Sequence, residues 1–390
     1  MCAVKLITDL SELGEVEAQW DRLAVACQAP MMSPACVMAW WRHLAPATAC
    51  ARVVVLEEDE TLIGIAPFYI DPAARRGRRD LRLPGIEIGA RLAPLALPGR
   101  EADVAQEIMR TVIHTEPRPD LIALEGMPLA FNWPHDMQTR SPGRVRPTVW
   151  QYQVLSCPVV TLNAKSFDEW LSGKSSKFRS QMRRAKRDFA AAGGTERIST
   201  LETLRGDIAA LMHLHESRWT HRGRSSFAAY GNALPAMLHD IGQTLLKKDG
   251  RFRLRMLEID KRPICADLTL SAGGRVIGMI SGWDDHFANL KPSMLAMLGT
   301  IEEALSRGDR LFDLGVVDKS YKLRFADTNA PVSWTILLPK GMRFPKTYCS
   351  VTLMVGRHTI KSAIKQRASS EQRDRYRRLR QRLRERRLAT

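Results

Sequence analysis

The sequence predicts an α/β (α+β) protein of two tandem domains, each a mixed, mainly antiparallel sheet flanked by helices. Its 390 residues are too many for one ordinary domain and fit two with a short remainder. Apolar residues recur with a period of about 3.6 in some stretches and about 2 in others, typical of helices and strands. Both halves also carry a similar hairpin pattern, beginning at Arg52 and at Arg253. We therefore expect an N-terminal domain at 1–155, a C-terminal domain at 156–345 and a basic extension at 346–390.

Helical and strand patterns alternate along the N-terminal part. We expect a helix around Leu13 to Leu23, an Ala- and Trp-rich helical stretch ending near Leu44, strands at Arg52–Glu57 and Leu62–Ile70, a strand near Leu81, a helix at Glu101–His114 and a strand at Leu121–Leu124. The stretch from Pro128 to Pro147 is rich in loop residues, and the domain boundary is placed after it.

The C-terminal part opens with a long basic helix. Its apolar side chains share one face because they are spaced at i, i+4, i+7, i+11 and i+14, at Phe178, Met182, Ala185, Phe189 and Ala192. The pair Gly193-Gly194 is typical of a helix end. We then expect helices at Leu201–His221 and Leu234–Lys247, an antiparallel meander at Arg251–Ile259, Ile264–Leu270 and Val276–Trp283, a helix from Pro292 to Gly308, and a buried strand at Arg310–Leu314.

The two hairpin patterns align at a constant offset of 201 residues. Arg52-Val-Val-Val-Leu-Glu-Glu-Asp-Glu-Thr-Leu-Ile63 shares five of twelve positions with Arg253-Leu-Arg-Met-Leu-Glu-Ile-Asp-Lys-Arg-Pro-Ile264. This identity favours a duplicated domain. The alternative is that two hairpins share composition by chance.

The net charge of +17 is concentrated at the C-terminus. Between Arg357 and Arg387 there are 13 Lys or Arg residues against three acidic residues, which accounts for +10 of the total. The remaining charge is spread over more than 350 residues and does not by itself indicate a nucleic-acid-binding protein. Through its basic tail the protein is expected to make at most weak contact with anionic membrane or nucleic acid.

Several common classes of protein are excluded by the absence of their motifs. Seven cysteines are scattered without a C-x-x-C pair, which favours reduced thiols. No signal-peptide pattern or long uncharged apolar run is present, so a cytoplasmic protein is expected. The sequence contains no H-E-x-x-H zinc motif, no G-x-S-x-G nucleophile elbow and no P-loop, and we expect no metal cofactor.

Three segments of the C-terminal half carry a family resemblance. They are Lys174-Ser-Ser-Lys-Phe-Arg-Ser-Gln-Met-Arg-Arg-Ala-Lys186, Pro263-Ile-Cys-Ala-Asp-Leu-Thr-Leu270, and Leu290 to Asp327 with Phe312-Asp-Leu-Gly315 and Tyr321-Lys322. Together they resemble the double-domain GNAT acetyltransferases of the cellulose-biosynthesis-associated, CelD-like group, which is akin to the FemAB-type aminoacyl transferases. The resemblance covers Ser166 to Asp327, and the hairpin at Arg52 to Ile70 also looks like the family's N-terminal half.

The resemblance implies two GNAT-like domains and an N-acyltransferase of polysaccharide biosynthesis. Its co-substrate is then acetyl-CoA or another acyl-CoA, and its acceptor an amine such as an amino sugar or an envelope or exopolysaccharide precursor. One position departs from the family pattern, because Leu290-Lys-Pro-Ser-Met294 lacks the glycine of the usual Ser-Pro-Gly turn. The turn before the helix that binds coenzyme A must therefore follow a different path.

The expected donor site is the junction between a strand and the following helix. Free N–H groups and the positive end of the dipole at a helix N-terminus attract phosphate. Amides near Ser281 and Gly282 are placed to bind a thioester carbonyl. The residues expected to bind the donor are Ser281, Gly282, Trp283, Lys291, Ser293, Met294 and Leu295. Lys291 fits equally well as a solvated loop lysine.

Tyr321, Lys322 and Asp313 are the predicted catalytic residues. The resemblance places Tyr321 where a GNAT fold presents an acid to the leaving sulfur, although an aromatic ring that only packs is the alternative. Asp313 lies on a buried strand, where an unpaired carboxylate is costly. It either pairs with Lys322 or Arg324, or it deprotonates the amine.

The acceptor is expected to bind near Glu216, Trp219, Arg222 and Asp284. The first three fall on one side of a helix, and amphipathic packing is the alternative. Asp284 and its neighbour Asp285 are also rival candidates for the base. The basic residues Arg179, Arg183 and Lys186 form a solvated face or bind an acidic acceptor. The N-terminal domain has no counterpart of Tyr321-Lys322, so we expect a degenerate copy that shapes the acceptor cleft.

A second hypothesis belongs to a different class. The basic helix and tail would fit a FemAB-like transferase that uses aminoacyl-tRNA, or a nucleic-acid-binding protein. A rise in melting temperature with coenzyme A or with RNA discriminates between the hypotheses, because a ligand stabilises the folded state to which it binds.

Replacing Tyr321 with Phe is expected to lower turnover much more than it raises the Michaelis constant for the acyl donor. The substitution removes a proton donor that acts late in the reaction and leaves donor contacts in place. Steady-state kinetics with detection of the free thiol measures both constants. An unchanged turnover number removes Tyr321 from the mechanism.

Overall fold

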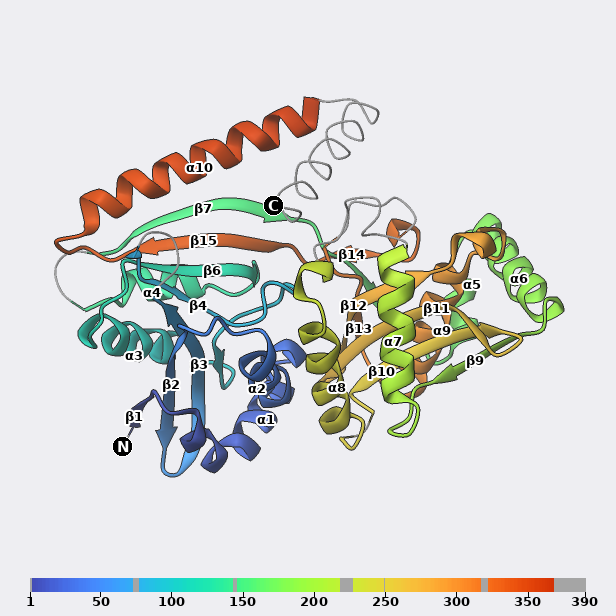
Figure 1. Cartoon of the computed structure of the whole chain (residues 1–390), viewed down its shortest axis with the longest axis horizontal. Helices are drawn as coiled ribbons and strands as arrows, with labels where there is room; N and C mark the ends of the chain where they lie inside the picture. The colour runs from blue at the N-terminus through green and yellow to red at the C-terminus, as the bar shows by residue number, and fades with distance from the viewer. Residues whose placement is uncertain are drawn as a thin grey trace.

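Two sheets lie side by side in the computed structural model, which describes residues 2–72, 77–142, 146–217, 227–248, 250–316 and 322–367 (Figure 1). The strand order in the first sheet is β1-β2-β3-β4-β6-β15-β7, with β5 paired to β3. The order in the second sheet is β14-β8-β13-β12-β11-β10-β9. Both sheets are mixed and mainly antiparallel, and helices flank them. The predicted fold class is confirmed.

The first sheet and its helices come mostly from the N-terminal part. Its strands are β1 Cys2–Ile7, β2 Cys50–Glu58, β3 Thr61–Asp71, β4 Asp80–Arg82, β5 Leu95–Ala96, β6 Leu121–Pro128, β7 Thr148–Leu155 and β15 Val332–Leu338. Its helices are η1 Leu10–Glu15, α1 Glu17–Ala26, η2 Pro30–Met32, α2 Pro34–His43, α3 Glu101–His114, α4 Trp133–Thr139 and α10 Phe344–Arg367.

The second sheet belongs to the C-terminal part. Its strands are β8 Pro158–Thr161, β9 Gly194–Ile198, β10 Phe252–Ile259, β11 Arg262–Ala272, β12 Arg275–Trp283, β13 Leu311–Asp313 and β14 Thr328–Asn329. Its helices are α5 Phe167–Ser172, α6 Ser176–Ala191, α7 Leu204–His215, η5 Phe227–Tyr230, α8 Ala233–Leu245, η6 Asp285–Leu290, α9 Pro292–Ser306 and η7 Lys322–Arg324.

The apolar face expected of the basic helix is the buried face of α6. Phe178, Met182, Ala185 and Phe189 are buried there, whereas Ala192, which was expected on the same face, is the exposed residue that caps the end of the helix. Gly193 follows the helix with φ +71°, the left-handed conformation that favours glycine at a helix end. Gly194 then begins β9, an edge strand with the mixed sequence Gly-Thr-Glu-Arg-Ile that the sequence pattern did not predict. Edge strands lack the regular alternation that reveals a half-buried strand.

The two hairpins at offset 201 have the same irregular geometry. In each pair the register shifts at one corresponding position, after Leu56 in β2 and after Leu257 in β10. Each hairpin turns through two residues with positive φ, Asp59 and Glu60 at 48° and 61°, and Asp260 and Lys261 at 50° and 63°. The parallel pair β4 and β6 in the first sheet likewise corresponds to the parallel pair β12 and β13 in the second. Duplication accounts for this agreement better than shared composition does.

The chain crosses between the sheets twice. The strands β7 and β8 are adjacent in sequence but lie in different sheets. The strand β15 follows all of the second sheet, yet it returns to the first and pairs antiparallel with both β6 and β7. The C-terminal domain therefore ends before Val332, and not at residue 345 as the sequence pattern indicated. An apolar strand is needed at this place, since Val332, Ile336, Leu337 and Leu338 are all buried.

One continuous apolar core joins the two domains. It combines the side chains of α1, α2 and α3 with those of α7 and α8 and with one face of the second sheet. The helices α2 and α8 pack against each other between the sheets (Figure 1). Polar contacts cross the same interface, with an ion pair of 2.9 Å between Arg251 Nη1 and Asp21 Oδ2 and a hydrogen bond of 2.8 Å between His43 Nε2 and Asp240 Oδ2. A separate core lies beneath α6 and α9.

The helix α10 lies across the outside of the first sheet, over β15 and β7 (Figure 1). Val351 is fully buried there among Leu121, Ala123, Ile336 and Leu338. Part of the basic extension expected at 346–390 is therefore helical and packs on the first sheet. Of the helices described, none is both long enough and apolar enough to cross a bilayer.

The segment 1–155 is not expected to fold on its own, because β15 separates β6 from β7 in the complete sheet. Isolated 1–155 should show no cooperative thermal transition by circular dichroism. Fusing residues 330–356 to its C-terminus through a short glycine linker should restore one, since this peptide carries β15 and the packed part of α10. Cooperative unfolding of the unfused segment would show that the exchanged strand is dispensable.

Candidate functional site

The candidate site lies where two parallel strands part. β12 pairs with β13 only from Arg275 to Ile277, opposite Leu311 to Asp313. Beyond Ile277 the strand β12 continues to Trp283, and it bulges because Leu268 pairs with Ile280 while Thr269 pairs with Gly278. In the described parts of the chain, β13 therefore leaves the edge of β12 uncovered from Gly278 onward. Parted strands expose main-chain donors and acceptors that a sheet would otherwise use.

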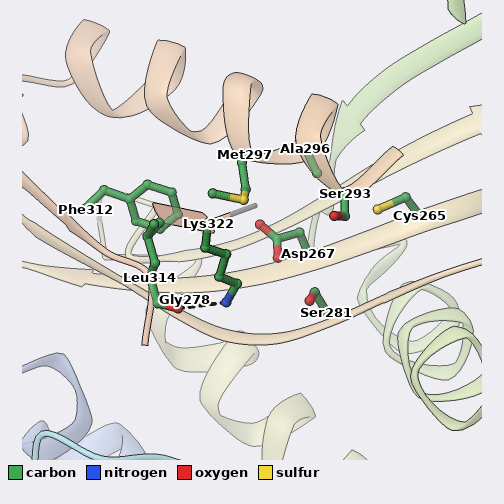
Figure 2. Close-up of a pocket in the computed structure, with 10 residues that line it drawn as sticks. All are labelled: Cys265, Asp267, Gly278, Ser281, Ser293, Ala296, Met297, Phe312, Leu314 and Lys322. Carbon is green, nitrogen blue, oxygen red and sulfur yellow. Dashed lines mark hydrogen bonds between the residues drawn. The ribbon is translucent and has the colours of Figure 1, made fainter. Parts of the chain in front are cut away.

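A cavity occupies the gap between the parted strands and α9. Its volume of about 20 Å³ is enough for one water molecule. The side chains around it include a carboxylate, an ammonium group, two hydroxyls and a thiol, and they point toward one another in Figure 2. The lining residues are Cys265, Asp267, Gly278, Ser281, Ser293, Ala296, Met297, Phe312, Leu314 and Lys322.

Lys322 enters the cavity from η7. Its Nζ donates a hydrogen bond of 2.8 Å to the carbonyl oxygen of Leu314, just after β13 (Figure 2). Burial lowers the pKa of Lys322, and the neighbouring carboxylates of Asp267 and Asp313 oppose that shift only in part. The sequence placed Lys322 among the catalytic residues, and the structure places it in the cavity.

Asp267 faces the same cavity from β11. Burial raises the pKa of its carboxyl, and the charges of Lys322 and Arg255 and a hydrogen bond from Thr300 counteract part of the rise. The pKa of the Asp267 carboxyl is thus raised and that of the Lys322 ammonium group is lowered, so both pKa values shift toward neutral pH. Two titratable groups shifted in this way are typical of acid–base catalysis.

A buried polar network holds α9 above Asp267. Arg255 of β10 forms ion pairs with Glu196 and with Glu303, the latter with 2.7 Å between Nη2 and Oε2. α9 passes close to this guanidinium because it has a glycine there. A Cβ on Gly299 would lie 2.6 Å from Arg255 Nη1 and 2.5 Å from Glu196 Oε1. Thr300 is the next residue of α9, and its side chain forms a hydrogen bond with the carboxyl of Asp267.

Asp313 lies beside the cavity but is held by two arginines. It is fully buried and forms an ion pair with Arg91 from the N-terminal domain, while Arg275 Nη1 lies 3.8 Å from Oδ2. The amide of Gly315 donates to its other oxygen at 2.9 Å. Burial raises the pKa of Asp313, and the charge of Arg91 opposes this. Asp313 is therefore ion-paired, as one of the two expectations had it, but with Arg91 and Arg275 and not with Lys322 or Arg324. A role for Asp313 as a base stays a prediction.

The expected donor-binding residues separate into two groups. Ser281 and Ser293 line the cavity, and Lys291 stands at the start of α9 with φ +55°. The carbonyl of Lys291 accepts from the amides of Met294 and Leu295 at 2.9 and 3.2 Å. Within the described turn, the Ser293 amide is therefore left for a ligand.

The other expected donor residues serve packing. Met294 and Leu295 are buried in the core beneath α9, and Trp283 packs against that core. Gly282 lies under the end of α7, where a Cβ would come within 2.3 Å of the His215 amide nitrogen. His215 also donates from Nδ1 to the carbonyl oxygen of Ser281 at 2.9 Å, which fixes the main chain behind the cavity.

A second, larger pocket lies at the end of β12 on the side of α7. Its volume is about 470 Å³, and it is lined by Ala210, His213, Leu214, Ser217, Arg262, Pro263, Trp283, Asp284, Asp285 and His286. Asp284 Oδ2 lies 2.6 Å from Arg262 Nη2, and Oδ1 lies 2.7 Å from His286 Nδ1. Burial raises the pKa of Asp284, but hydrogen bonds from His286 and the charge of Arg262 outweigh it and lower the pKa overall.

The predicted acceptor residues are only partly described. Asp284 lines the larger pocket, and Glu216 is the residue that ends α7, next to Ser217 of that pocket. Trp219, Arg222 and Tyr321 lie outside the described residues, so their expected roles stay predictions.

The N-terminal domain lacks the groups that make the cavity. At offset 201, Cys265 corresponds to Gly64 and Asp267 to Ala66, at matching positions in the two hairpins. A Cβ on Gly64 would lie 2.6 Å from Val104 Cγ2, so α3 closes directly onto β3. These differences favour the hypothesis of a degenerate copy.

Sequence reasoning missed Asp267, the central carboxylate of the site. Its signal is a single acidic residue in the middle of the otherwise buried strand from Ile264 to Leu270. An acid inside such a strand must either be paired or have a shifted pKa. In the described residues no group of acidic, His and Cys side chains is arranged to hold a metal ion.

Comparison with known proteins gives one family and several similar folds. A family model described as acetyltransferase (GNAT) domain matches residues 176–323, which contain the cavity. No curated protein matches the sequence. Among solved structures, FemX is similar with a TM-score of 0.60 at 11% identity, covering 85% of this chain and 96% of that chain.

Two further structures are similar at comparable levels. The C-terminal domain of a putative lysylphosphatidylglycerol synthetase from Agrobacterium fabrum has a TM-score of 0.54 at 10% identity, covering 88% of this chain and 96% of that chain. The L-PGS structure from Bacillus licheniformis has a TM-score of 0.51 at 12% identity, covering 90% and 99%. At such low identity these similarities concern the fold.

Replacing Asp313 with Leu is expected to destabilise the protein by about 3–5 kcal/mol, because it leaves Arg91 and Arg275 buried without their counter-ion. Arg91→Leu should also be destabilising. The double variant should lose clearly less than the sum of the two, since Arg91 is then removed together with its counter-ion and only Arg275 is left without one. Urea denaturation measures all three, and additive losses would show that the pair does not act as a unit.

Proposed function

We propose that the chain is a GNAT-type N-acyltransferase that moves a small acyl group from coenzyme A to an amine, a proposal supported by the GNAT domain matched at residues 176–323 and by the FemX-like fold. The observation that carries this proposal is the pair Asp267 and Lys322, which share one cavity at the point where β12 and β13 part. The acyl group we propose is acetyl, the group named in the description of the matching family model.

The uncovered edge of β12 supports a donor site at this position. In the described residues β13 pairs with β12 only as far as Ile277, and main-chain amides at such an edge are suited to bind the thioester carbonyl and the oxyanion formed from it. The start of α9 offers the Ser293 amide and the positive end of the helix dipole to an anionic donor. Lys291 adds a positive charge at the same turn. Coenzyme A would therefore lie along the gap, with its pyrophosphate near Lys291.

The two titratable groups fit the two proton transfers of acyl transfer to an amine. The cationic amine first loses one proton to solvent. Its neutral nitrogen then attacks the thioester carbon, and Asp267 accepts the second proton that the nitrogen loses. The C–S bond then breaks, and the ammonium group of Lys322 donates a proton to the thiolate. Asp267 is left protonated and Lys322 neutral, so transfer of one proton between them restores the site. Tyr321 is the rival candidate for the acid.

The larger pocket on the α7 side supports an acceptor site. Asp284 and Asp285 provide negative charge to attract a cationic amine, and Trp283 provides an apolar surface. The pocket of about 470 Å³ has room for a monosaccharide-sized acceptor. An amino sugar or envelope precursor is the acceptor we propose. Acceptor and donor would then meet at the end of β12 from opposite sides of the sheet.

A second candidate donor is an aminoacyl-tRNA, as in FemAB-type transferases. The specific observation in its favour is the exposed basic surface of α6, which contacts η6 and α9. Its exposed residues Lys177, Arg183, Arg184 and Arg187 could follow a phosphate backbone. Thiol release from acetyl-CoA, measured with a panel of amines, separates the two donors. Transfer that requires a charged tRNA and releases no thiol would overturn the coenzyme A proposal.

The pH profile of kcat is expected to be bell-shaped. Asp267 acts as a base only when ionised, so the rate rises with pH through its raised pKa. Lys322 acts as an acid only when protonated, so the rate falls again as pH passes its lowered pKa. Asp267→Asn should remove the acidic limb and Lys322→Met the alkaline limb, each lowering kcat by about 10²–10⁴.

Glu302→Gln provides a matched control, since Glu302 is an exposed acid on α9 whose partner is Lys186. It should retain the whole profile and rate. Variants of Asp267 and Lys322 that change the KM for the donor but leave both limbs in place would contradict the assigned roles.

A further inference from the structure

We propose that α10 binds the surface of an anionic membrane through its outward face. The proposal does not depend on the acyl-transfer chemistry, because α10 lies over the first sheet, away from β12, β13 and α9 of the second sheet and its helices (Figure 1). It rests on three observations: one face of α10 is packed on the first sheet, the opposite face exposes apolar side chains, and the segment that contains the helix carries only basic charges.

The inward face of α10 is firmly attached to the protein. Val351 is fully buried against β6 and β15, and the ring of Tyr348 packs 4.9 Å from that of Trp150 on β7. Arg78 Nη1 donates to Ser350 Oγ at 3.1 Å, and Arg343 Nη1 lies 3.1 Å from Asp120 Oδ2. The helix therefore cannot turn over to hide its outer side chains in the core.

The outward face carries apolar side chains that nothing in the described structure covers. Cys349, Leu353 and Ile360 follow one another at i, i+4 and i+11, which places them along one side of a helix. Leu353 is 63% exposed and Ile360 is 62% exposed, whereas large aliphatic side chains are commonly buried. Met342, just before the helix, is fully exposed. The sequence continues the spacing to Ile364.

The charged side chains of the segment that contains α10 are all positive. From Thr328 to Ser370 the sequence has no Asp or Glu, while it contains seven basic residues, Lys340, Arg343, Lys346, Arg357, Lys361, Lys365 and Arg367. Arg357 falls one turn after Leu353, beside the apolar stripe. The residues that follow, up to Arg387, add further arginines in excess of acids.

An anionic membrane would interact with both the exposed apolar side chains and the basic residues of this surface. A helix lying in the interface buries its apolar side chains among the lipids and holds its basic residues near the headgroups. Nucleic acid would bind the basic residues but would leave the apolar side chains of Leu353 and Ile360 exposed to water. A second copy of the chain would present the same positive charge to this face. One ridge of large side chains is also small beside the roughly 800 Å² per partner that a stable protein interface buries.

Co-sedimentation of the full-length protein with lipid vesicles tests the proposal. We expect binding to vesicles of phosphatidylcholine that contain about one third phosphatidylglycerol, and little binding to phosphatidylcholine alone. The double variant Leu353→Ser, Ile360→Ser should bind the anionic vesicles about tenfold more weakly, since it removes apolar groups that enter the membrane. Both residues are exposed, so the melting temperature should be unchanged.

Leu201→Ser is the matched control, because Leu201 is another exposed leucine (40%) and lies just before α7, distant from α10 in the chain. It should bind vesicles like the unaltered protein. Equal binding by the double variant would overturn the role of the apolar stripe. Binding to heparin or RNA that exceeds binding to anionic vesicles, with no effect of the double variant, would overturn the membrane proposal in favour of a purely electrostatic partner.

Discussion

The buried carboxylate of Asp313 holds together the parts on which the candidate site depends. It joins Arg91 of the N-terminal domain, Arg275 at the start of β12 and the amide of Gly315 at the end of β13. A fully buried carboxylate is tolerated only with such partners, so their positions are fixed together. β13 separates from β12 at this same residue. The cavity therefore begins where the two strands can no longer follow each other.

The two halves of the chain share the same hairpin geometry, but only the second half forms a polar cavity next to it. Corresponding hairpins have the same register shift and the same turn, yet the second has Asp267 where the first has Ala66. In the first half α3 rests directly on Gly64, and the space that would form a cavity is closed. The N-terminal half instead contributes Arg91 to the site's framework. The strand β15 and a shared core bind it to its partner domain.

Burial sets the electrostatics of the second half. Arg255 lies beneath α9 and pairs with Glu196 and with Glu303 of that helix, and Gly299 allows α9 to come close to its guanidinium. Their charges are satisfied within the network, which leaves Asp267 and Lys322 facing a small, poorly solvated space. Loss of solvation disfavours both charged forms, which is why the pKa of the acid rises and that of the lysine falls.

The sequence by itself determined the fold class, the main helices and the two hairpins, because their apolar residues repeat with the period of each element. It also identified Lys322, Ser281 and Ser293, which the fold brings to one cavity. Only the tertiary structure decided the rest. β15 looked like part of the second domain because sequence order carries no information on which sheet a strand joins. The partners of Asp313 and the significance of Asp267 likewise depend on contacts between residues far apart in the chain, which local periodicity does not encode.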